Sequence, residues 1–398
     1  MKPKLAILGA GPVGLEAALA AAEGGYPFAL YEAGDGVAAA VRSWGHVRLF
    51  SPWSLNVSPR ARRLLAAVGL ELPADDTCPT GEELVERLFE PLAAQPSIAP
   101  HLRLGERVVA VSRDGLVKSD EIGTGRRAER PFRLLIRDAS GGERIDRADR
   151  VLDCTGTYDC PNQLGDGGIA APGEAAAEGA IERQIPRIDS SWAGLTTLLV
   201  GAGYSAQTAV RDLAELAERE PGTRVLWALR REDPLPPPPE DDPLPERAAL
   251  AATAGALSRA ASPAVETRFG VVVEALEAEA DRWRVTLRRR DDRVETVVVD
   301  RILSLTGYVG DHRLYRQLQV HECYATAGPM KLAAALLGSA GGDCLDQTGH
   351  GGDSLLNPEP GFFLLGSKSY GRNPTFLMRL GWEQVDEVFA LWARDRAA

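Results

Sequence analysis

The stretch "LAILGAGPVGLEAAL" at residues 5–19 has the pattern of a strand, a glycine-rich turn and a helix in direct succession. Gly9 permits the tight turn, and Gly11 lets the backbone come close to a pyrophosphate. Gly14 lets the helix pack closely on the strand, and Pro12 suits the first helical position. The free N–H groups at such a helix start attract phosphate oxygens. The pattern therefore predicts a dinucleotide-binding β-α-β unit.

The second strand of this unit, expected over residues 27–33, carries an acid near its end. Glu32 stands 18 residues beyond Gly14 (32 − 14). A carboxylate at this spacing accepts hydrogen bonds from ribose hydroxyls and repels a 2′-phosphate. The first site is therefore predicted to take FAD or NAD rather than NADP.

A second pattern of the same kind, "LLVGAGYSAQTAV", occupies residues 198–210. Gly201 and Gly203 take the places of the first two glycines. Ala206 takes the third place, where only a small residue is needed. Together with Ser205 at the helix start, these residues are predicted to hold a second dinucleotide.

The strand after this second turn ends in Arg230 and Arg231, where the first pattern has Glu32. Guanidinium groups can bind a 2′-phosphate through paired hydrogen bonds, which predicts NADPH. The alternative is a solvated strand end that tolerates NADH, because Glu232 is adjacent. Two sites of opposite charge preference indicate a hydride donor and a hydride acceptor on one chain, and hence a redox enzyme.

The composition is that of an acidic protein of 398 residues, long enough for two or three domains. A net charge of −11 makes nucleic acid an unexpected partner and gives no attraction to anionic membranes. Five scattered cysteines form no CxxC pair, so we expect reduced thiols, a cytoplasmic location and no metal. The sequence has no stretch of 18 apolar residues, so no membrane span is expected.

The remaining elements are predicted from periodicity and turn residues. Helices are expected at about 60–69, 80–95, 205–219 and 246–261, and strands at 106–112, at 131–138 and twice within 269–299. Thr80, with Glu83 three residues on, predicts a capping box. The proline- and acid-rich segment 232–246 is expected to be an extended surface loop.

Over nearly its full length the chain resembles the two-dinucleotide-binding-domain flavoproteins, which include the thioredoxin-reductase-like enzymes and the class B flavin monooxygenases. The resemblance is carried by both glycine patterns with Glu32 and the two arginines, by "LDCTGTYDCPN" at 152–162 and by "LSLTGY" at 303–308. It implies an α/β fold of two Rossmann-like, three-layer domains, with FAD and NADPH as cofactors. The NADPH domain, at 166–300, would be inserted into an FAD domain split into 1–165 and 301–398.

Several cofactor contacts are implied by this resemblance alone. Thr155 and Gly156 are placed near FAD, and Thr306 and Gly307 at the return from the NADPH domain. Val108, in the strand expected at 106–112, is also assigned to cofactor binding.

Near the C-terminus the chain departs from the family pattern. Gly366 is expected at the final flavin contact, but Ser367 follows it where the family has Asp, so Ser367, Ser369 or the backbone would substitute. Cys154 and Cys160 are separated by five residues, which matches neither spacing of the family's catalytic disulfides. Residues 178–196 also lack the histidine of the monooxygenase fingerprint.

The aromatic and polar segment 42–56 is expected to pass over the isoalloxazine ring. The predicted cofactor contacts are Arg42, Trp44 and Ser51, and the predicted catalytic residues are His46 and Asn56. The alternative is a surface loop whose tryptophans and histidine serve packing and hydrogen bonding.

A second group of candidates lies in the loop before the last helix. Lys368 and Arg372 are predicted as catalytic residues that hold an anionic substrate, and Thr375 as the cap of the helix. Solvated loop charges are the alternative.

Three hypotheses of function follow. The first is an NADPH-dependent flavin monooxygenase that oxygenates a small soft nucleophile with O2 through a C4a-hydroperoxide. The second is an NADPH:acceptor oxidoreductase that reduces a quinone, a disulfide or a protein. The third is a flavin-binding sensor without turnover. A monomer or a homodimer is expected in each case.

Overall fold

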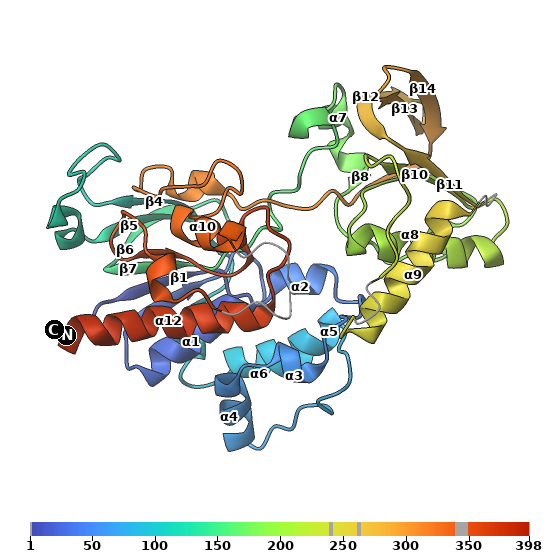
Figure 1. Ribbon diagram of the computed structural model, residues 1–398. Coiled ribbons are helices and arrows are strands. Elements are labelled where there is room, and N and C mark those ends of the chain that lie inside the picture. Colours follow the sequence, from blue (N-terminus) through green and yellow to red (C-terminus); the bar gives the residue numbers. More distant parts are fainter. Residues whose placement is uncertain (1, 239–241, 261–263, 339–348, 398) are drawn as a thin grey trace. The chain divides into compact units, whose positions relative to one another are not determined.

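The computed structural model describes residues 2–238, 242–260, 264–338 and 349–397, which form two compact units. Unit 1 comprises Met1–Cys160 and Val309–Ala398, and unit 2 comprises Pro161–Tyr308. Unit 2 is therefore inserted into unit 1 along the chain, as the sequence colours of Figure 1 show. The predicted fold class, two three-layer α/β domains with one inserted in the other, is confirmed.

The central sheet of unit 1 has five parallel strands in the order β16-β7-β1-β2-β3. Their bounds are Phe362–Leu364, Arg150–Asp153, Leu5–Leu8, Phe28–Tyr31 and Leu102–Arg103. Along β1, Leu5 and Ile7 pack with the helices, whereas Ala6 and Leu8 pack with a second sheet. The central sheet is therefore buried on both faces, as parallel sheets usually are.

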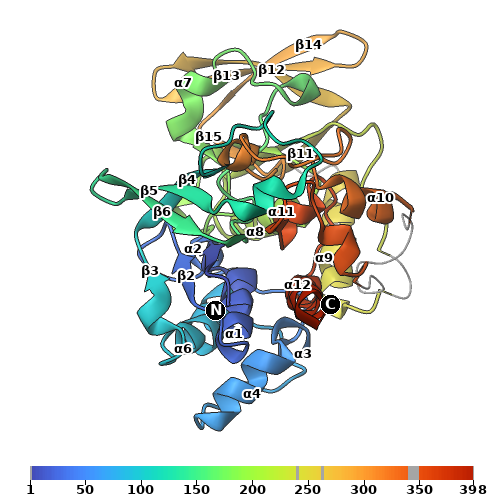
Figure 2. The same cartoon turned by 90° about the vertical axis from the view of Figure 1, so that its left-hand side faces the viewer.

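Two long helices and a small antiparallel sheet cover these faces. Helices α1 (Pro12–Glu23) and α12 (Met378–Ala397) lie side by side on one face (Figures 1 and 2). Strands β4 (Glu106–Arg113), β5 (Phe132–Asp138) and β6 (Glu143–Ala148) cover the other. No helix of the described residues is long and apolar enough to cross a membrane.

The other helices of unit 1 are short. They are α2 (Ala39–Ser43), α3 (Trp53–Asn56), α4 (Pro59–Ala67), α5 (Gly81–Leu84), α6 (Glu90–Ala93), α10 (Met330–Gly338) and α11 (Ser367–Tyr370). The capping box predicted at the start of α5 is confirmed, because Thr80 and Glu83 exchange both hydrogen bonds, at 2.7 and 3.1 Å. A π-helical turn at Val85–Phe89 joins α5 to α6, so the helix predicted at 80–95 is present but irregular.

The central sheet of unit 2 has the strand order β11-β10-β9-β15-β8. Their bounds are Val265–Phe269, Arg224–Leu229, Thr196–Val200, Arg301–Ser304 and Ile181–Glu182. Helices α8 (Tyr204–Arg219) and α9 (Pro245–Arg259) pack on one face, and an antiparallel sheet packs on the other. That sheet consists of β12 (Val271–Glu279), β13 (Arg282–Arg289) and β14 (Val294–Val299).

Two expectations for unit 2 were wrong. Residues 269–299 hold three strands instead of two, because the turn at Asp292 divides the second half of the segment into a hairpin. The boundary expected at residue 301 falls too early. Strand β15 pairs in parallel with β9, so the chain stays in unit 2 until Tyr308.

Loop 114–130, between β4 and β5, is fastened by three buried charges. Glu359, just before β16, accepts from Arg113 Nε at 2.6 Å and from Arg127 Nη2 at 2.8 Å. Burial raises the pKa of Glu359, but hydrogen bonds from Arg127 and Arg113 outweigh burial and hold it below its ordinary value. The carboxylate is therefore ionised at the amino end of β16.

Candidate dinucleotide sites

The first glycine turn leaves open space where a pyrophosphate would lie. Gly9 has a φ of +89°, which favours glycine, and a Cβ at Gly14 would overlap the Gly9 carbonyl oxygen. A Cβ at Gly11 would meet no atom within 4 Å. No side chain caps the start of α1, so its first N–H groups remain available. The turn therefore fits an anionic ligand bound by backbone.

Glu32 supports this turn directly. Its carboxylate accepts the amide of Ala10 at 2.7 Å and the amide of Gly34 at 2.9 Å. The side chain is largely buried, at 9% exposure of the residue. Each carboxylate oxygen can accept a further hydrogen bond, so the group can hold the turn and still receive ribose hydroxyls.

Three turns meet at the carboxyl ends of β1, β7 and β16. A Cβ at Gly9 would come within 3.1 Å of the Thr155 Cα, which follows β7. A Cβ at Gly156 would lie 3.8 Å from the Ser367 hydroxyl, which follows β16. In open α/β sheets this edge is where ligands bind, so Thr155, Gly156 and Gly366 lie at an edge where a ligand could reach them, and their contact with FAD stays a prediction.

The second turn has the same organisation with a different shape. Gly201 has a φ of +135°, and a Cβ there would overlap the Leu305 carbonyl oxygen. A Cβ at Gly203 would meet nothing within 4 Å, and α8 begins there without a side-chain cap. Ala206 is fully buried below the turn, whereas Ser205 is exposed beside it. Trp227 Nε1 donates to the Gly201 carbonyl at 2.8 Å and braces the turn.

The two arginines after β10 differ in their hydrogen bonds and exposure. Arg231 is half-buried, and its Nε donates to the Asp233 carbonyl at 2.6 Å. Arg230 is exposed, and its guanidinium makes no hydrogen bond or ion pair with a residue that the structure describes. Arg230 is therefore the cation that a 2′-phosphate could pair with, while Arg231 shapes the strand end.

The segment 42–56 contains residues with other partners than predicted. Asn56 is buried, and its amide donates to the carbonyl oxygens of Ser51 at 2.8 Å and Pro52 at 2.9 Å. Its Oδ1 accepts the Ser51 hydroxyl at 3.0 Å. Asn56 and Ser51 therefore close a local turn, and neither Asn56 as a catalytic group nor the Ser51 hydroxyl as a cofactor donor fits this structure.

Arg42 lies in α2, and Trp44 and His46 follow that helix. Arg42 is exposed and pairs with Glu90 at 3.0 Å, an interaction that water screens. The Trp44 ring packs on Gly81, and its buried Nε1 has no hydrogen-bond partner in the described structure. His46 is half-buried. The unmet Nε1 donor of Trp44 makes that residue the strongest ligand-facing candidate of the three.

In the C-terminal loop, Lys368 is not a solvated or substrate-binding charge. Its ammonium is fully buried and lies 2.7 Å from the Asp153 carboxylate. The Ser369 hydroxyl donates to the Gly366 carbonyl at 2.7 Å and accepts from Gln384 at 2.9 Å, so it is not free for a cofactor. Ser367 is half-buried beside Gly156, so of the two serines it remains the candidate for a cofactor contact.

Arg372 and Thr375 lie further along this loop. The exposed guanidinium of Arg372 forms no ion pair within the described residues, so it remains a candidate for an anionic substrate. Thr375 does not cap the last helix, because α12 begins at Met378 and the Thr375 hydroxyl bonds to Asn373 at 2.7 Å. Val108 pairs with Ile136 in β5, directly before a bulge of β4, because the next pair joins Ala110 and Leu135.

The cysteines of the described residues give no sign of a catalytic pair. Cys154 is buried directly below the first glycine turn, and burial with the nearby Asp153 charge raises the pKa of its thiol well above the ordinary value. The pKa of Cys160 is also raised, chiefly by burial. Cys344 lies outside the described residues. No group of three or more potential metal ligands occurs in the described part of the chain.

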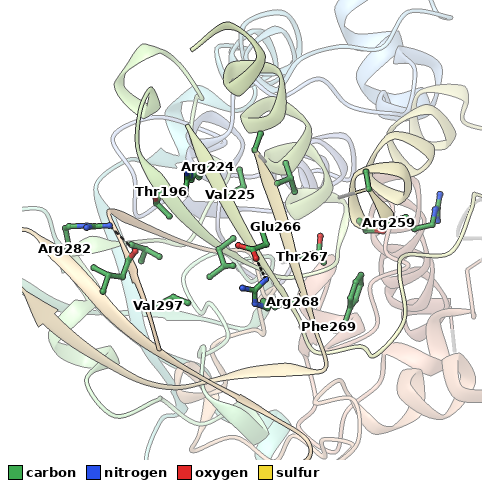
Figure 3. A pocket seen from close by; sticks show the side chains of 17 residues that line it. Thr196, Arg224, Val225, Arg259, Glu266, Thr267, Arg268, Phe269, Arg282 and Val297 are labelled. Carbon is green, nitrogen blue, oxygen red and sulfur yellow. Dashed lines mark hydrogen bonds and ion pairs between the residues drawn. The ribbon is translucent and has the colours of Figure 1, made fainter. Parts of the chain in front are cut away.

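A cavity of about 900 Å³ lies elsewhere in unit 2 (Figure 3). It runs from the amino ends of β9 and β10, at Thr196 and Arg224, along β11 to Phe269. Two of its arginines already have carboxylate partners, Arg268 with Glu266 at 2.8 Å and Arg282 with Asp300 at 3.0 Å. Its lining does not include the second glycine turn or Arg230.

Sequence reasoning missed the residues that hold the turns from below. Asp153, Gln384 and Trp227 are all buried, and each bonds to a turn residue or its neighbour. Asp153 ends an apolar strand, and such an interrupting acid was the one available signal.

No protein-family model matches the chain, and a search of curated proteins finds no similar one. Solved structures do match over nearly full length. The bacillithiol disulfide reductase Bdr (YpdA) from Bacillus cereus has a TM-score of 0.71 at 19% identity, over 99% of this chain and 100% of that chain. Ornithine N-hydroxylase KtzI of Kutzneria sp. 744, with reduced FAD, NADP+ and L-ornithine, has a TM-score of 0.64 at 14% identity, over 100% of both. Thioredoxin reductase of Lactococcus lactis has 0.60 at 15%, over 99% and 100%.

Proposed function

We propose that this chain, which has the fold of the two-dinucleotide-binding-domain flavoproteins, is an FAD-containing, NADPH-dependent oxidoreductase. One observation carries the proposal. Each unit has a glycine turn with open space above its second glycine, followed by an acid in unit 1 and by an unengaged arginine in unit 2. Such a chain binds one dinucleotide without and one with a 2′-phosphate.

FAD belongs to unit 1 in this proposal. Backbone N–H groups at Gly11 and the start of α1 would bind the pyrophosphate, and Glu32 the ribose hydroxyls. The turns at Thr155 and Ser367 border the same strand ends. When bound, FAD supplies a group that accepts a hydride and passes its electrons on. The protein contributes orientation and exclusion of water at these turns.

NADPH belongs to unit 2. The backbone at Gly203 and the start of α8 would bind its pyrophosphate, and Arg230 its 2′-phosphate. The exposed Ser205 hydroxyl stands at the same helix start, where it can donate to a phosphate oxygen.

Within this class we favour a monooxygenase that oxygenates a small soft nucleophile with O2. The support is that Cys154 is buried in the core below the first turn, where its thiol is hard to ionise. Cys154 and Cys160 are the one candidate for a catalytic disulfide at that site among the described residues, so the burial of Cys154 argues against a disulfide reductase. The second glycine pattern also has the Ser-Ala form found in class B monooxygenases. The alternative is transfer of electrons from NADPH to another acceptor, and the missing fingerprint histidine in residues 178–196 favours it.

The test begins with the purified full chain and its flavin content. Protein that is yellow, or becomes so with FAD, and is bleached anaerobically by NADPH faster than by NADH supports the proposal. Colourless protein that takes up no FAD would contradict it. Bound flavin that NADPH cannot reduce would instead favour a sensor.

The reaction of the reduced protein with O2 distinguishes a monooxygenase from an NADPH:acceptor oxidoreductase. The NADPH-reduced protein is mixed with O2, and absorbance is followed for a transient that differs from both oxidised and reduced flavin. Such a transient supports the monooxygenase. Direct reoxidation with one peroxide per NADPH, together with fast anaerobic turnover on a quinone or a disulfide, supports the alternative.

A further inference from the structure

Asp153 and Lys368 form an ion pair in the interior of unit 1. Asp153 is the last residue of β7, and Lys368 lies in α11, directly after β16. The Lys368 Nζ is 2.7 Å from Asp153 Oδ2, and both side chains have 0% exposure. Because β7 and β16 are neighbours in the sheet, the pair joins the two chain segments at their carboxyl ends.

The same pair fixes Thr155. Asp153 Oδ1 accepts the Thr155 amide at 3.1 Å and the Thr155 hydroxyl at 2.7 Å. The Lys368 ammonium donates to that hydroxyl oxygen at 3.1 Å and lies 5.2 Å from the centre of the Tyr315 ring. The Thr155 hydroxyl therefore donates to one member of the pair and accepts from the other, which leaves its rotamer no freedom.

Thr155 is also the residue through which the pair reaches the open edge. It is exposed, although both of its charged partners are buried. Its Cα adjoins Gly9, and the next residue, Gly156, adjoins Ser367. A displacement of Thr155 would therefore move the surface between the first glycine turn and the turn at Gly366.

We propose that Asp153 and Lys368 are positioning residues of the flavin site, which fix the Thr155–Gly156 turn against the Gly366–Ser367 turn. The inference rests on the proposed function and names residues that hold the site without touching the cofactor. Apolar side chains of similar size often stabilise a core as well as a buried ion pair does. They cannot reproduce the directed hydrogen bonds to Thr155, so stability and FAD binding should separate.

The experiment removes both charges together in the full chain. The double variant K368M/D153L leaves no unpaired buried charge, so we expect its apoprotein to melt close to the wild type. Its FAD dissociation constant, measured by flavin fluorescence, should rise at least about tenfold, because the Thr155 turn is no longer held. At saturating FAD its visible spectrum should be shifted from that of the wild type.

A second variant keeps the anchor without the charges. K368M/D153N retains an oxygen that can accept from Thr155, so it should recover most of the FAD affinity. As a matched control, Arg113→Met breaks a buried ion pair at the opposite end of β16. We expect that control to lower the melting temperature and to leave the FAD affinity and the spectrum unchanged.

The outcomes distinguish this inference from the proposed function. If K368M/D153L binds FAD as tightly as the wild type, with an unchanged spectrum, the positioning role is overturned and the proposed function stands. The positioning role is equally overturned if Arg113→Met weakens FAD binding to the same extent. If the wild type itself takes up no FAD, the proposed function fails first. NADP+ affinity, a property of unit 2, should be equal in all variants and confirms that unit 2 is folded, while the melting of the apoprotein reports on unit 1.

Discussion

The two glycine turns solve the same binding problem with different tolerances. In unit 1, Gly14 cannot carry a Cβ because that atom would overlap the Gly9 carbonyl oxygen. In unit 2, Ala206 stands at the equivalent place and its methyl group is buried below the turn. The first residue of each turn also differs, with a φ of +89° at Gly9 and +135° at Gly201. The size of residue allowed at the third position therefore depends on the backbone conformation of each turn.

The charged partners of the two turns differ in a second way. Glu32 accepts two backbone amides and is part of the turn that it serves. Arg230 is exposed, and no described residue pairs with it. An acid that builds its own site should affect folding as well as binding when it is replaced. Replacement of an exposed arginine without a protein partner should affect nucleotide binding alone.

The largest expected effect is at the third position of the turns. Gly14→Ala places a methyl group on backbone that cannot move away, so FAD binding should fall by more than about 100-fold and unit 1 should lose stability. Ala206→Gly removes a buried methyl group and should cost only about 1 kcal/mol. Flavin titration and thermal melting of both variants check this. Equal losses would contradict the difference between the turns.

The next effect concerns the choice of nucleotide. Arg230→Ala should weaken NADPH binding about 10- to 100-fold through the lost charged hydrogen bonds, and leave NADH unchanged. Arg231→Ala should have a smaller effect on NADPH, because that guanidinium is bound to the Asp233 carbonyl. The dissociation constants of NADPH and NADH, measured for both variants, test this prediction. A larger loss in the second variant would reverse the assignment.

A more selective effect is expected at the second glycines. Gly11 and Gly203 have ordinary negative φ values, and a Cβ at either meets no protein atom within 4 Å. Gly11→Ala should therefore leave melting unchanged and weaken only FAD binding, about tenfold. Gly203→Ala should weaken only NADP+ binding by a similar factor. A cross-effect of either variant on the other nucleotide would count against separate sites.

The smallest expected effect is on the pH dependence of the stability of unit 1. The pKa of Glu359 lies below its ordinary value of 4.5, so its folded form binds the proton less readily than its unfolded form. The stability from this carboxylate is complete above the unfolded pKa and is lost as pH falls through the folded pKa. Melting temperatures between pH 6 and 3 should drop less steeply in Glu359→Gln than in the wild type, from a lower starting value.

The main elements of both dinucleotide units could be predicted because their signals are local. Periods of apolar residues and the glycine spacing specified β1, α1, β9 and α8 within a few residues of their observed bounds. Strand β11 was missed, because "VETRF" at 265–269 is short and charged, and only its pairing with β10 makes it a strand.

The polar candidates were harder, because their partners are distant in sequence or hidden by the local fold. Lys368 was predicted to hold an anionic substrate, but its ammonium pairs with a buried carboxylate that lies 215 residues away in the sequence. Asn56 was expected to face a ligand, but its own preceding residues take all of its hydrogen bonds. Residue type indicates what chemistry a side chain can perform, whereas tertiary contacts determine whether it is available.

The discontinuity of unit 1 has a consequence for biosynthesis. Strands β1, β2 and β7 leave the ribosome early, but β16 and α12, which complete their sheet and core, follow only after all of Pro161–Tyr308. The inserted unit has every strand of its sheets in one continuous segment and can fold first. Nascent chains stalled near residue 345 should therefore contain a protease-resistant unit 2 beside a still digestible first half, which reverses the usual order of cotranslational folding.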